Sequence, residues 1–257
     1  MDALRKLRLA LNKGEELRFL SHLDFAQAVE RTIRRAEIQM AYSEGFNPHM
    51  KISFSSALAL GITASPEYLD MDVLDEDSVE NIMARFNAAA PPGLEATAGK
   101  VMEGRVKKMM AICNYATYEV TGPVEIDGRC AVNEDGSFNA DVVEKAKSID
   151  WDSLLAAFND KTEVAYEKVT PKKTRIIDVK HFVKDPISVD VRDNGYVTLT
   201  MSIGIYPEGT VKPSEMWNIG RQMFGWPLTD AYEIHRKAIL IQDKDGLISP
   251  MDVKPLD

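Results

Sequence analysis

The chain has 257 residues, 45% of them hydrophobic, which is enough for two domains of roughly 100 to 130 residues each. Its net charge of -9 argues against a protein that coats nucleic acid nonspecifically, because such binding needs many Lys and Arg side chains to displace counterions from phosphates. No stretch approaches the ~18 apolar residues of a membrane span, and the first residues lack the apolar core of a signal peptide. We therefore expect a cytoplasmic chain with no membrane partner.

The first predicted elements are a strand and a helix. Residues 4–21 read as a strand or a ragged hairpin, interrupted by a turn-like Lys13-Gly14-Glu15. A helix is expected from Ser21, because Asp24 follows three residues later in the pattern of a capping box. The apolar residues beyond this cap fall within one helical arc of about 100°; they are Phe25, Ala26, Val29, Ile33 and Ala36.

The rest of the N-terminal half completes a familiar order of elements. Strands are predicted within 51–60 and 68–74, separated by a Gly/Pro-punctuated loop. An amphipathic helix at 79–89, stopped by two prolines, and a strand at 94–102 follow. Strand, helix, two strands, helix, strand is the βαββαβ order of a ferredoxin-like domain.

The second half repeats this order at the level of pattern. A strand at 111–124 leads through a polar loop to a helix at 150–160, and an Asp-Asn-Gly turn joins two strands within 187–203. The remaining predicted elements are strands at 165–169, 174–183 and 232–241 and a helix at 212–224. The predicted fold class is α+β, with two ferredoxin-like (βαββαβ) domains in tandem, built on antiparallel sheets. Their predicted ranges are 1–104 and 110–257.

The segment "YSEGFNPHMKISF", residues 42–54, has the composition of a binding loop. Pro48 restricts Asn47 to an extended conformation, so the segment is a shaped loop rather than a helix. His49, Lys51 and backbone N–H groups are suited to a phosphate or carboxylate, Asn47 to an amide-like edge, and Phe46 or Tyr42 to stacking on a base. The alternative is an ordered turn that satisfies its own backbone groups.

Ser21 and His22 form a second candidate at the start of the first helix, where unpaired N–H groups and the helix dipole favour anions. His22 is either a general base or a hydrogen-bonding residue of the turn. If His22 and His49 converged, they would form an acid/base pair of the kind that RNA-cleaving enzymes use; the spacing does not require this. Asp70 and Asp72, on one strand face, either meet a cation or face solvent.

Two basic groups are candidates for nucleic-acid binding. Arg31, Arg34 and Arg35 share a face of the first helix, and Lys172, Lys173 and Arg175 lie in "KVTPKKTRIIDVK". The alternative for both is a solvated charged surface. No cofactor or metal is predicted: Cys113 and Cys130 match no ligand spacing, and phosphate-loop, nucleophile-elbow, dinucleotide and HExxH motifs are absent.

Residues 18–73 resemble a bacterial radical-SAM-linked family of unknown function, whose members are encoded beside or fused behind cobalamin-binding radical S-adenosylmethionine proteins, often near ribonuclease G. The resemblance rests on "FLSHLD", "YSEGFNPH" and "EYLD". It implies a radical S-adenosylmethionine protein as the partner, since two cysteines cannot supply the three ligands of a CxxxCxxC cluster motif. Because this family has no established activity, the resemblance implies none for the chain.

Three functions are therefore open. The first is an accessory protein that presents an RNA, such as tRNA or rRNA, or another substrate to a radical S-adenosylmethionine partner. The second is a metal-independent RNA-processing endonuclease resembling the doubled ferredoxin-like CRISPR endonucleases, with His22 and His49 as acid and base and Lys51 stabilising charge. The third is a protein-interaction module that does not bind RNA.

Overall fold

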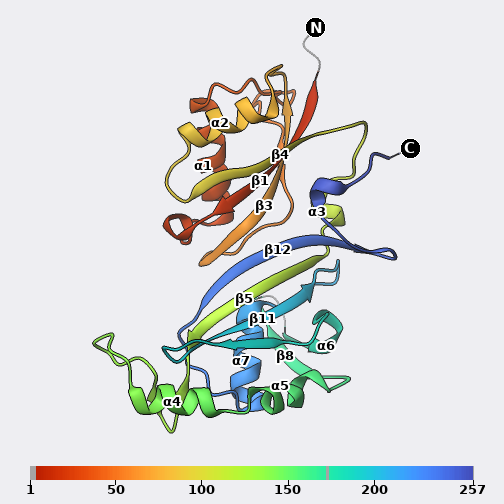
Figure 1. Cartoon of the computed structure of the whole chain (residues 1–257). Helices are drawn as coiled ribbons and strands as arrows, with labels where there is room; N and C mark the ends of the chain where they lie inside the picture. The colour runs from red at the N-terminus through yellow and green to blue at the C-terminus, as the bar shows by residue number, and fades with distance from the viewer. Residues whose placement is uncertain (1–3, 172–173, 257) are drawn as a thin grey trace. The chain divides into compact units, whose positions relative to one another are not determined.

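The computed structural model describes residues 4–171 and 174–256 and divides into two compact units (Figure 1). One unit comprises Met1–Tyr115 with Arg236–Asp257, and the other Ala116–His235. Each combines helices with antiparallel strands, so the α+β class is confirmed. The domain ranges 1–104 and 110–257 stay a prediction about the folding units. No helix in the described part of the chain is long and apolar enough to cross a bilayer.

The first unit follows the order βαββαβ over residues 5–102. Its elements are β1 (Arg5–Lys13), η1 (Glu15–Leu17), α1 (His22–Arg35), β2 (Ile52–Phe54), β3 (Ile62–Val73), α2 (Val79–Ala89), β4 (Leu94–Met102) and α3 (Met109–Ile112). It also contains β12 (Glu233–Asp243) from Arg236 onward, β13 (Gly246–Ile248) and η2 (Pro250–Asp252). β1 pairs antiparallel with β3 and β4, and β2 pairs antiparallel with β3, which gives the order β4-β1-β3-β2.

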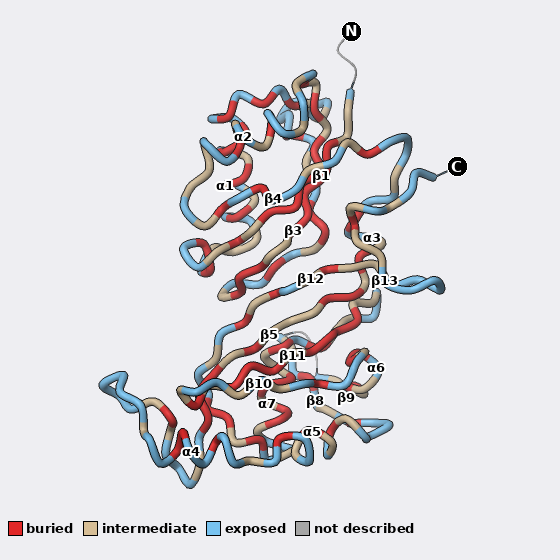
Figure 2. The backbone as a smooth tube through the Cα atoms, in the orientation of Figure 1, coloured by how far each residue is buried: buried red, intermediate tan, exposed pale blue. Residues whose placement is uncertain are grey.

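The two faces of this sheet differ because side chains alternate along a strand. Leu7, Leu9 and Leu11 of β1 point into the apolar core. Figure 1 shows α1 and α2 on one face of this sheet. Arg8 points to the opposite face, and Figure 2 shows that β1 is buried along most of its length. The core therefore fixes which residues of β1 and β3 face away from the helices.

Several predicted elements of the first unit are confirmed and two are wrong. The cap at Ser21 and the bounds of α2 and β4 are as predicted. The strand expected within 51–60 is only Ile52–Phe54, and the loop expected at 61–67 is the start of β3. Pro66 lies where the β1–β3 register shifts, between the pairs Leu11–Glu67 and Lys13–Ala64. A proline at such an irregularity removes no ladder hydrogen bond, so it did not end the strand.

The second unit is built on the strand order β10-β11-β5. Its strands are β5 (Tyr115–Pro123) from Ala116 onward, β6 (Glu125–Ile126), β7 (Arg129–Cys130), β8 (Ala165–Val169), β9 (Thr174–Asp178), β10 (Ser188–Val191) and β11 (Tyr196–Gly204). Its helices are α4 (Ala140–Ser148), α5 (Trp151–Asn159), α6 (Val179–Phe182) and α7 (Pro213–Phe224). β6 pairs with β7, and β8 with β9, as separate hairpins.

Three elements here depart from the sequence prediction. α4 replaces part of the expected polar loop, because Asn139 caps it and Val142, Val143 and Ala146 bury one side. The strand expected at 174–183 ends at Asp178, whose side chain accepts from Lys180 N and starts α6. The first residues of the strand expected at 111–124 belong instead to α3, in the first unit.

Candidate anion-binding site

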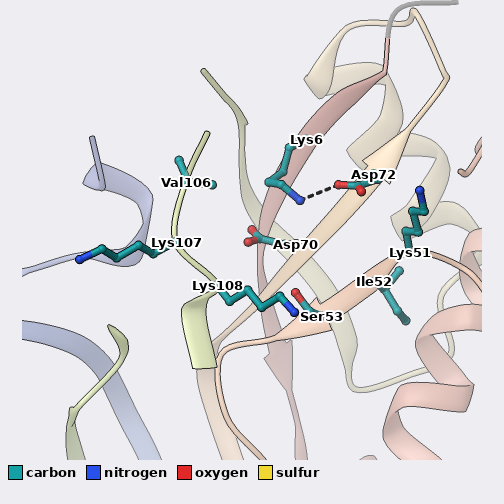
Figure 3. A pocket seen from close by; sticks show the side chains of 9 residues that line it. All are labelled: Lys6, Lys51, Ile52, Ser53, Asp70, Asp72, Val106, Lys107 and Lys108. Carbon is teal, nitrogen blue, oxygen red and sulfur yellow. Dashed lines mark hydrogen bonds and ion pairs between the residues drawn. The ribbon is translucent and has the colours of Figure 1, made fainter. Parts of the chain in front are cut away.

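A cavity of about 330 Å³ opens on the first unit, on the sheet face turned away from α1 and α2 (Figure 3). Its walls come from β1, β2, β3 and the segment that leads into α3. The lining residues are Lys6, Lys51, Ile52, Ser53, Asp70, Asp72, Val106, Lys107 and Lys108.

The strand register places the charged residues of this cavity. Lys6 lies opposite Asp72, and Arg8 lies opposite Asp70, across the β1–β3 ladder. Residues directly opposite on one face of an antiparallel pair are close enough for their side chains to interact. Because Leu7 faces the apolar core, its two neighbours on β1 both face the cavity side.

Both carboxylates of the cavity are neutralised by β1. Arg8 Nε and Nη2 donate to the two oxygens of Asp70 at 2.6 and 2.8 Å, and Arg8 is completely buried. Lys6 Nζ lies 2.6 Å from Asp72 Oδ1. A buried charge must be paired in this way to offset its lost hydration. In residues 4–171 and 174–256, no cluster of three or more His, Cys, Asp or Glu is arranged to hold a metal ion.

The remaining cations give the cavity a positive balance. Four lysines and two aspartates are among the residues that line it. Within the described chain, the side chains of Lys51, Lys107 and Lys108 make no ion pair or hydrogen bond with protein groups. Figure 3 shows Lys108 extending toward Ser53, whereas Lys107 points away from the cavity. Ammonium groups without a carboxylate partner are suited to bind phosphate or another anion.

The structure places the predicted loop residues beside this cavity. Lys51 lines it, while Tyr42, Asn47 and His49 precede it in an exposed loop. The stem of the loop is joined to β3, since Ala41 N donates to Asp72 O and Asp72 N donates to Lys51 O. Of the predicted anion-binding residues, Lys51 alone belongs to the cavity lining. Binding by the other predicted residues stays a prediction.

Ser21 and His22 lie elsewhere, at the start of α1. Ser21 Oγ accepts from Asp24 N at 3.2 Å and donates to Asp24 Oδ2 at 2.6 Å, as an N-cap should. The half-buried His22 ring meets Phe54 edge-on, with 5.3 Å between centroids. Among the described residues, no hydrogen bond or ring contact joins His22 to His49. The role of these two histidines as an acid/base pair stays a prediction.

His22 lies near charged residues that the sequence does not associate with it. Burial lowers the pKa of the His22 imidazole; Glu67 acts in the opposite direction, and Arg236 and Lys13 lower the pKa further. Arg236 donates to Glu67 through Nε at 2.8 Å and through Nη2, and to Ser56 through Nη1 at 2.7 Å. Near neutral pH, a neutral imidazole is favoured at this place.

Lys13 holds the backbone next to His22. Its buried ammonium group donates to the carbonyls of Arg18 and Leu20 at 3.3 and 3.1 Å. Burial lowers the pKa of Lys13, while Glu67 raises it and Arg236 lowers it. These contacts are mostly with backbone and buried groups, so the cluster stabilises the turn before α1.

The predicted nucleic-acid residues are dispersed. Arg34 lies 3.5 Å from Glu30, and Arg35 donates to the carbonyl of Ala89 at 2.8 Å, where α2 ends. Arg31 reaches Gln27 at 3.5 Å, at the limit of a hydrogen bond. Arg175, in the second unit, donates to the carbonyl of Glu208 at 3.1 Å. Lys172 and Lys173 lie outside the described residues. Nucleic-acid binding by these residues stays a prediction.

The sequence reading missed Lys6, Ser53, Lys107 and Lys108, although each is visible in the printed chain. A signal was present for Lys6: Lys6 and Arg8 alternate with leucines in the first strand, as Asp70 and Asp72 alternate with Leu69 and Met71 in the third. Both cysteines are free, and burial raises the pKa of the Cys113 thiol to about 11. That pKa makes Cys113 a poor nucleophile.

The fold is of the α+β class, and the cavity is a candidate anion site. A comparison with known protein families shows which family the chain belongs to. A family described as "Uncharacterized protein conserved in bacteria (DUF2344)" matches residues 6–213. The chain therefore belongs to this bacterial family of uncharacterized proteins. No curated protein matches the chain.

Two solved structures are similar over most of the chain, at low identity. A "Cbf5-Nop10-Gar1 Complex" crystal structure matches 93% of this chain and 50% of that chain, with 9% identity and a TM-score of 0.44. The chain thus spans about half the length of that protein. An "Unknown Protein from Galdieria sulphuraria" matches 91% of this chain and 99% of that chain, with 8% identity and a TM-score of 0.26. Scores this low support no inference about function.

Proposed function

We propose that the chain is an accessory protein that binds RNA, through its phosphates, for a radical S-adenosylmethionine partner. The observation that carries RNA binding is the cavity on β1, β2 and β3, where Lys51 and Lys108 have no carboxylate partner and both aspartates are already paired. An entering phosphate therefore meets ammonium groups without displacing an existing pair. Phosphate contacts of this kind supply most of the affinity of proteins for nucleic acid.

The proposal includes a ferredoxin-like first unit. The order β4-β1-β3-β2, all antiparallel, with α1 and α2 on one face, supports this assignment. In the second half of the sequence, β5, the helices α4 and α5, β10, β11, α7 and β12 follow the same βαββαβ order when the hairpins and α6 are treated as insertions, although β12 belongs to the first unit from Arg236 onward. A second ferredoxin-like unit is proposed on that ground alone.

The radical S-adenosylmethionine partner is proposed from the resemblance of residues 18–73. The chain itself has only two cysteines, too few for the CxxxCxxC motif that binds the iron–sulfur cluster of such a protein. Tagged protein from its native cell is expected to co-purify with a radical S-adenosylmethionine protein. If RNA is recovered without that protein, the proposed partner is wrong and the proposal of RNA binding stands.

Binding of tRNA and rRNA fragments, measured by fluorescence anisotropy at several salt concentrations, tests the RNA proposal. We expect Lys51→Ala and Lys108→Ala each to weaken binding by about 1 to 3 kcal/mol and to reduce the salt slope by about one. Lys161→Ala, an exposed lysine of the second unit, is the matched control. Equal affinities for all variants would overturn the assignment of the cavity.

The same reagents separate the two alternatives. Cleavage of RNA in EDTA that is lost in His22→Ala or His49→Ala would favour the endonuclease. No RNA binding at physiological salt, together with a co-purifying radical S-adenosylmethionine protein, would favour the interaction module.

A further inference from the structure

The loop at residues 42–50 is closed rather than loose. Ser43 N donates to His49 O at 2.9 Å, and His49 N donates to Ser43 Oγ at 3.0 Å. Tyr42 and Met50 form an antiparallel bridge below these contacts, and Met50 is buried. Gly45 adopts a φ of 117°, which only glycine reaches readily. The tip of the loop is therefore held in a defined shape.

This closed loop presents an aromatic side chain that nothing covers. Phe46 is fully exposed (106%), more than any other large apolar side chain in the described part of the chain. Tyr42, at the base of the loop, is also exposed. Leaving a phenylalanine in water forgoes the stabilisation that its burial would give. An ordered loop with such a tip has the properties of a binding element.

The loop tip lies within reach of the basic cavity. Lys51, five residues after Phe46, lines that cavity, and Lys51 N donates to Ala41 O across the stem. Five residues span at most about 17 Å when fully extended. A ligand that contacts both the cavity and Phe46 therefore needs an anionic group for the lysines and an aromatic face for Phe46.

We propose that this loop and the lysine cavity together bind a single-stranded polynucleotide, with a base stacked on Phe46 and neighbouring phosphates at Lys51 and Lys108. This inference rests on the proposed RNA binding. Every base has a face that can stack on an aromatic ring, whereas bases inside a duplex are already stacked. The exposed side chains of Asn47 and His49, in the same loop as Phe46, supply hydrogen-bonding groups that match a base edge better than an apolar protein pocket.

The test is the affinity of the full chain for a labelled 12-nucleotide single-stranded RNA, measured by fluorescence anisotropy. We expect Phe46→Ala to weaken binding about tenfold, within the range for loss of one stacked base, and Phe46→Trp to retain it. Phe19→Ala is the matched control, because Phe19 is also exposed (75%) but lies before α1. The melting temperature of both alanine variants should equal that of the wild type.

Two further arms separate this inference from the proposed function. Inorganic triphosphate should compete equally well in wild type and Phe46→Ala, because it fills only the lysine cavity. Single-stranded DNA of the same length should show the same dependence on Phe46, and duplex RNA should show none.

If Phe46→Ala binds the single strand as tightly as Phe19→Ala while Lys108→Ala binds weakly, the stacking inference is wrong and RNA binding at the cavity stands. If the wild type binds none of the nucleic acids, both proposals are wrong.

Discussion

Two motif-bearing segments of the first unit have similar compositions but opposite surroundings. At "FLSHLD", Ser21 is used as a helix cap and His22 packs on Phe54. At "YSEGFNPH", Phe46 and His49 project from a closed loop into solvent. The histidine of the first segment is thus packed against the protein, whereas the histidine of the second segment is exposed to solvent.

The difference lies in what is underneath each segment. Beneath the first, the Lys13 ammonium group and the Glu67–Arg236 ion pair are buried. Beneath the second, Met50 is the buried residue, and the polar groups of the loop bond chiefly to each other. We therefore expect substitutions in and below "FLSHLD" to change stability and substitutions in "YSEGFNPH" to change binding.

The largest effect is expected for Glu67→Ala, which leaves the buried Arg236 guanidinium without its carboxylate. Only about 2% of either side chain is exposed. Breaking a buried pair by removing one partner destabilises a protein by roughly 3 to 5 kcal/mol. The free energy of unfolding in urea measures this loss.

The matched control is Glu44→Ala in the exposed loop, expected to change the free energy of unfolding by less than about 0.5 kcal/mol. Equal, small losses in both variants would remove the contrast between the two segments.

A smaller effect is expected for Ser21→Ala, because Asp24 N loses its acceptor. Removal of an N-cap serine costs ~1 kcal/mol. RNA affinity should not change, since the cap lies outside the cavity lining. Ser43→Ala removes a similar acceptor from His49 N in the loop and should cost less, because no helix N-terminus loses its cap there. A loss of RNA binding in Ser21→Ala at an unchanged melting temperature would place Ser21 in the site.

The pH dependence of stability tests the surroundings of His22. Its pKa is lowered in the folded protein, chiefly by burial, from an ordinary value of 6.5. Below the folded pKa both states are protonated, and the full cost of burying the imidazolium is present. Between that pKa and 6.5 the unfolded state binds more protons, so stability rises with pH. Above 6.5 the effect is complete.

We expect the difference in unfolding free energy between wild type and His22→Asn to change with pH in this window and to be constant above it. A difference that is constant at every pH would contradict the proposed surroundings of His22.

The sequence predicted the parts of the fold that depend on local signals. Ser21 and Asp24 marked the start of α1, and the double proline marked the end of α2. The short β2 and the long β3 were not predictable in this way, because the bulge at Pro66 depends on pairing with β1. Local Gly and Pro residues indicated a loop where tertiary pairing maintains a strand.

The candidate site depended even more on contacts between distant residues. Lys51 and the loop before it were singled out from composition, but Lys108 joins them only through the fold. Glu67 and Arg236 are 169 positions apart, and nothing in either local sequence indicates their pairing. Neither residue stands out as a core position in the printed chain, since charged residues are seldom fully buried.

The smallest change in stability, and a clear change in binding, is expected for His49→Ala. The His49 backbone carries both hydrogen bonds that close the loop, whereas its side chain is exposed, so alanine retains the loop and removes only the imidazole. The free energy of unfolding should change by less than about 0.5 kcal/mol. RNA affinity should fall by about 0.5 to 1.5 kcal/mol, the net contribution of a typical hydrogen bond. His49→Asn, which keeps a hydrogen-bonding side chain, should recover part of this affinity. If His49→Ala instead lowers stability as much as Ser21→Ala and binds RNA normally, the loop belongs with "FLSHLD" as a structural element and the contrast between the two segments is wrong.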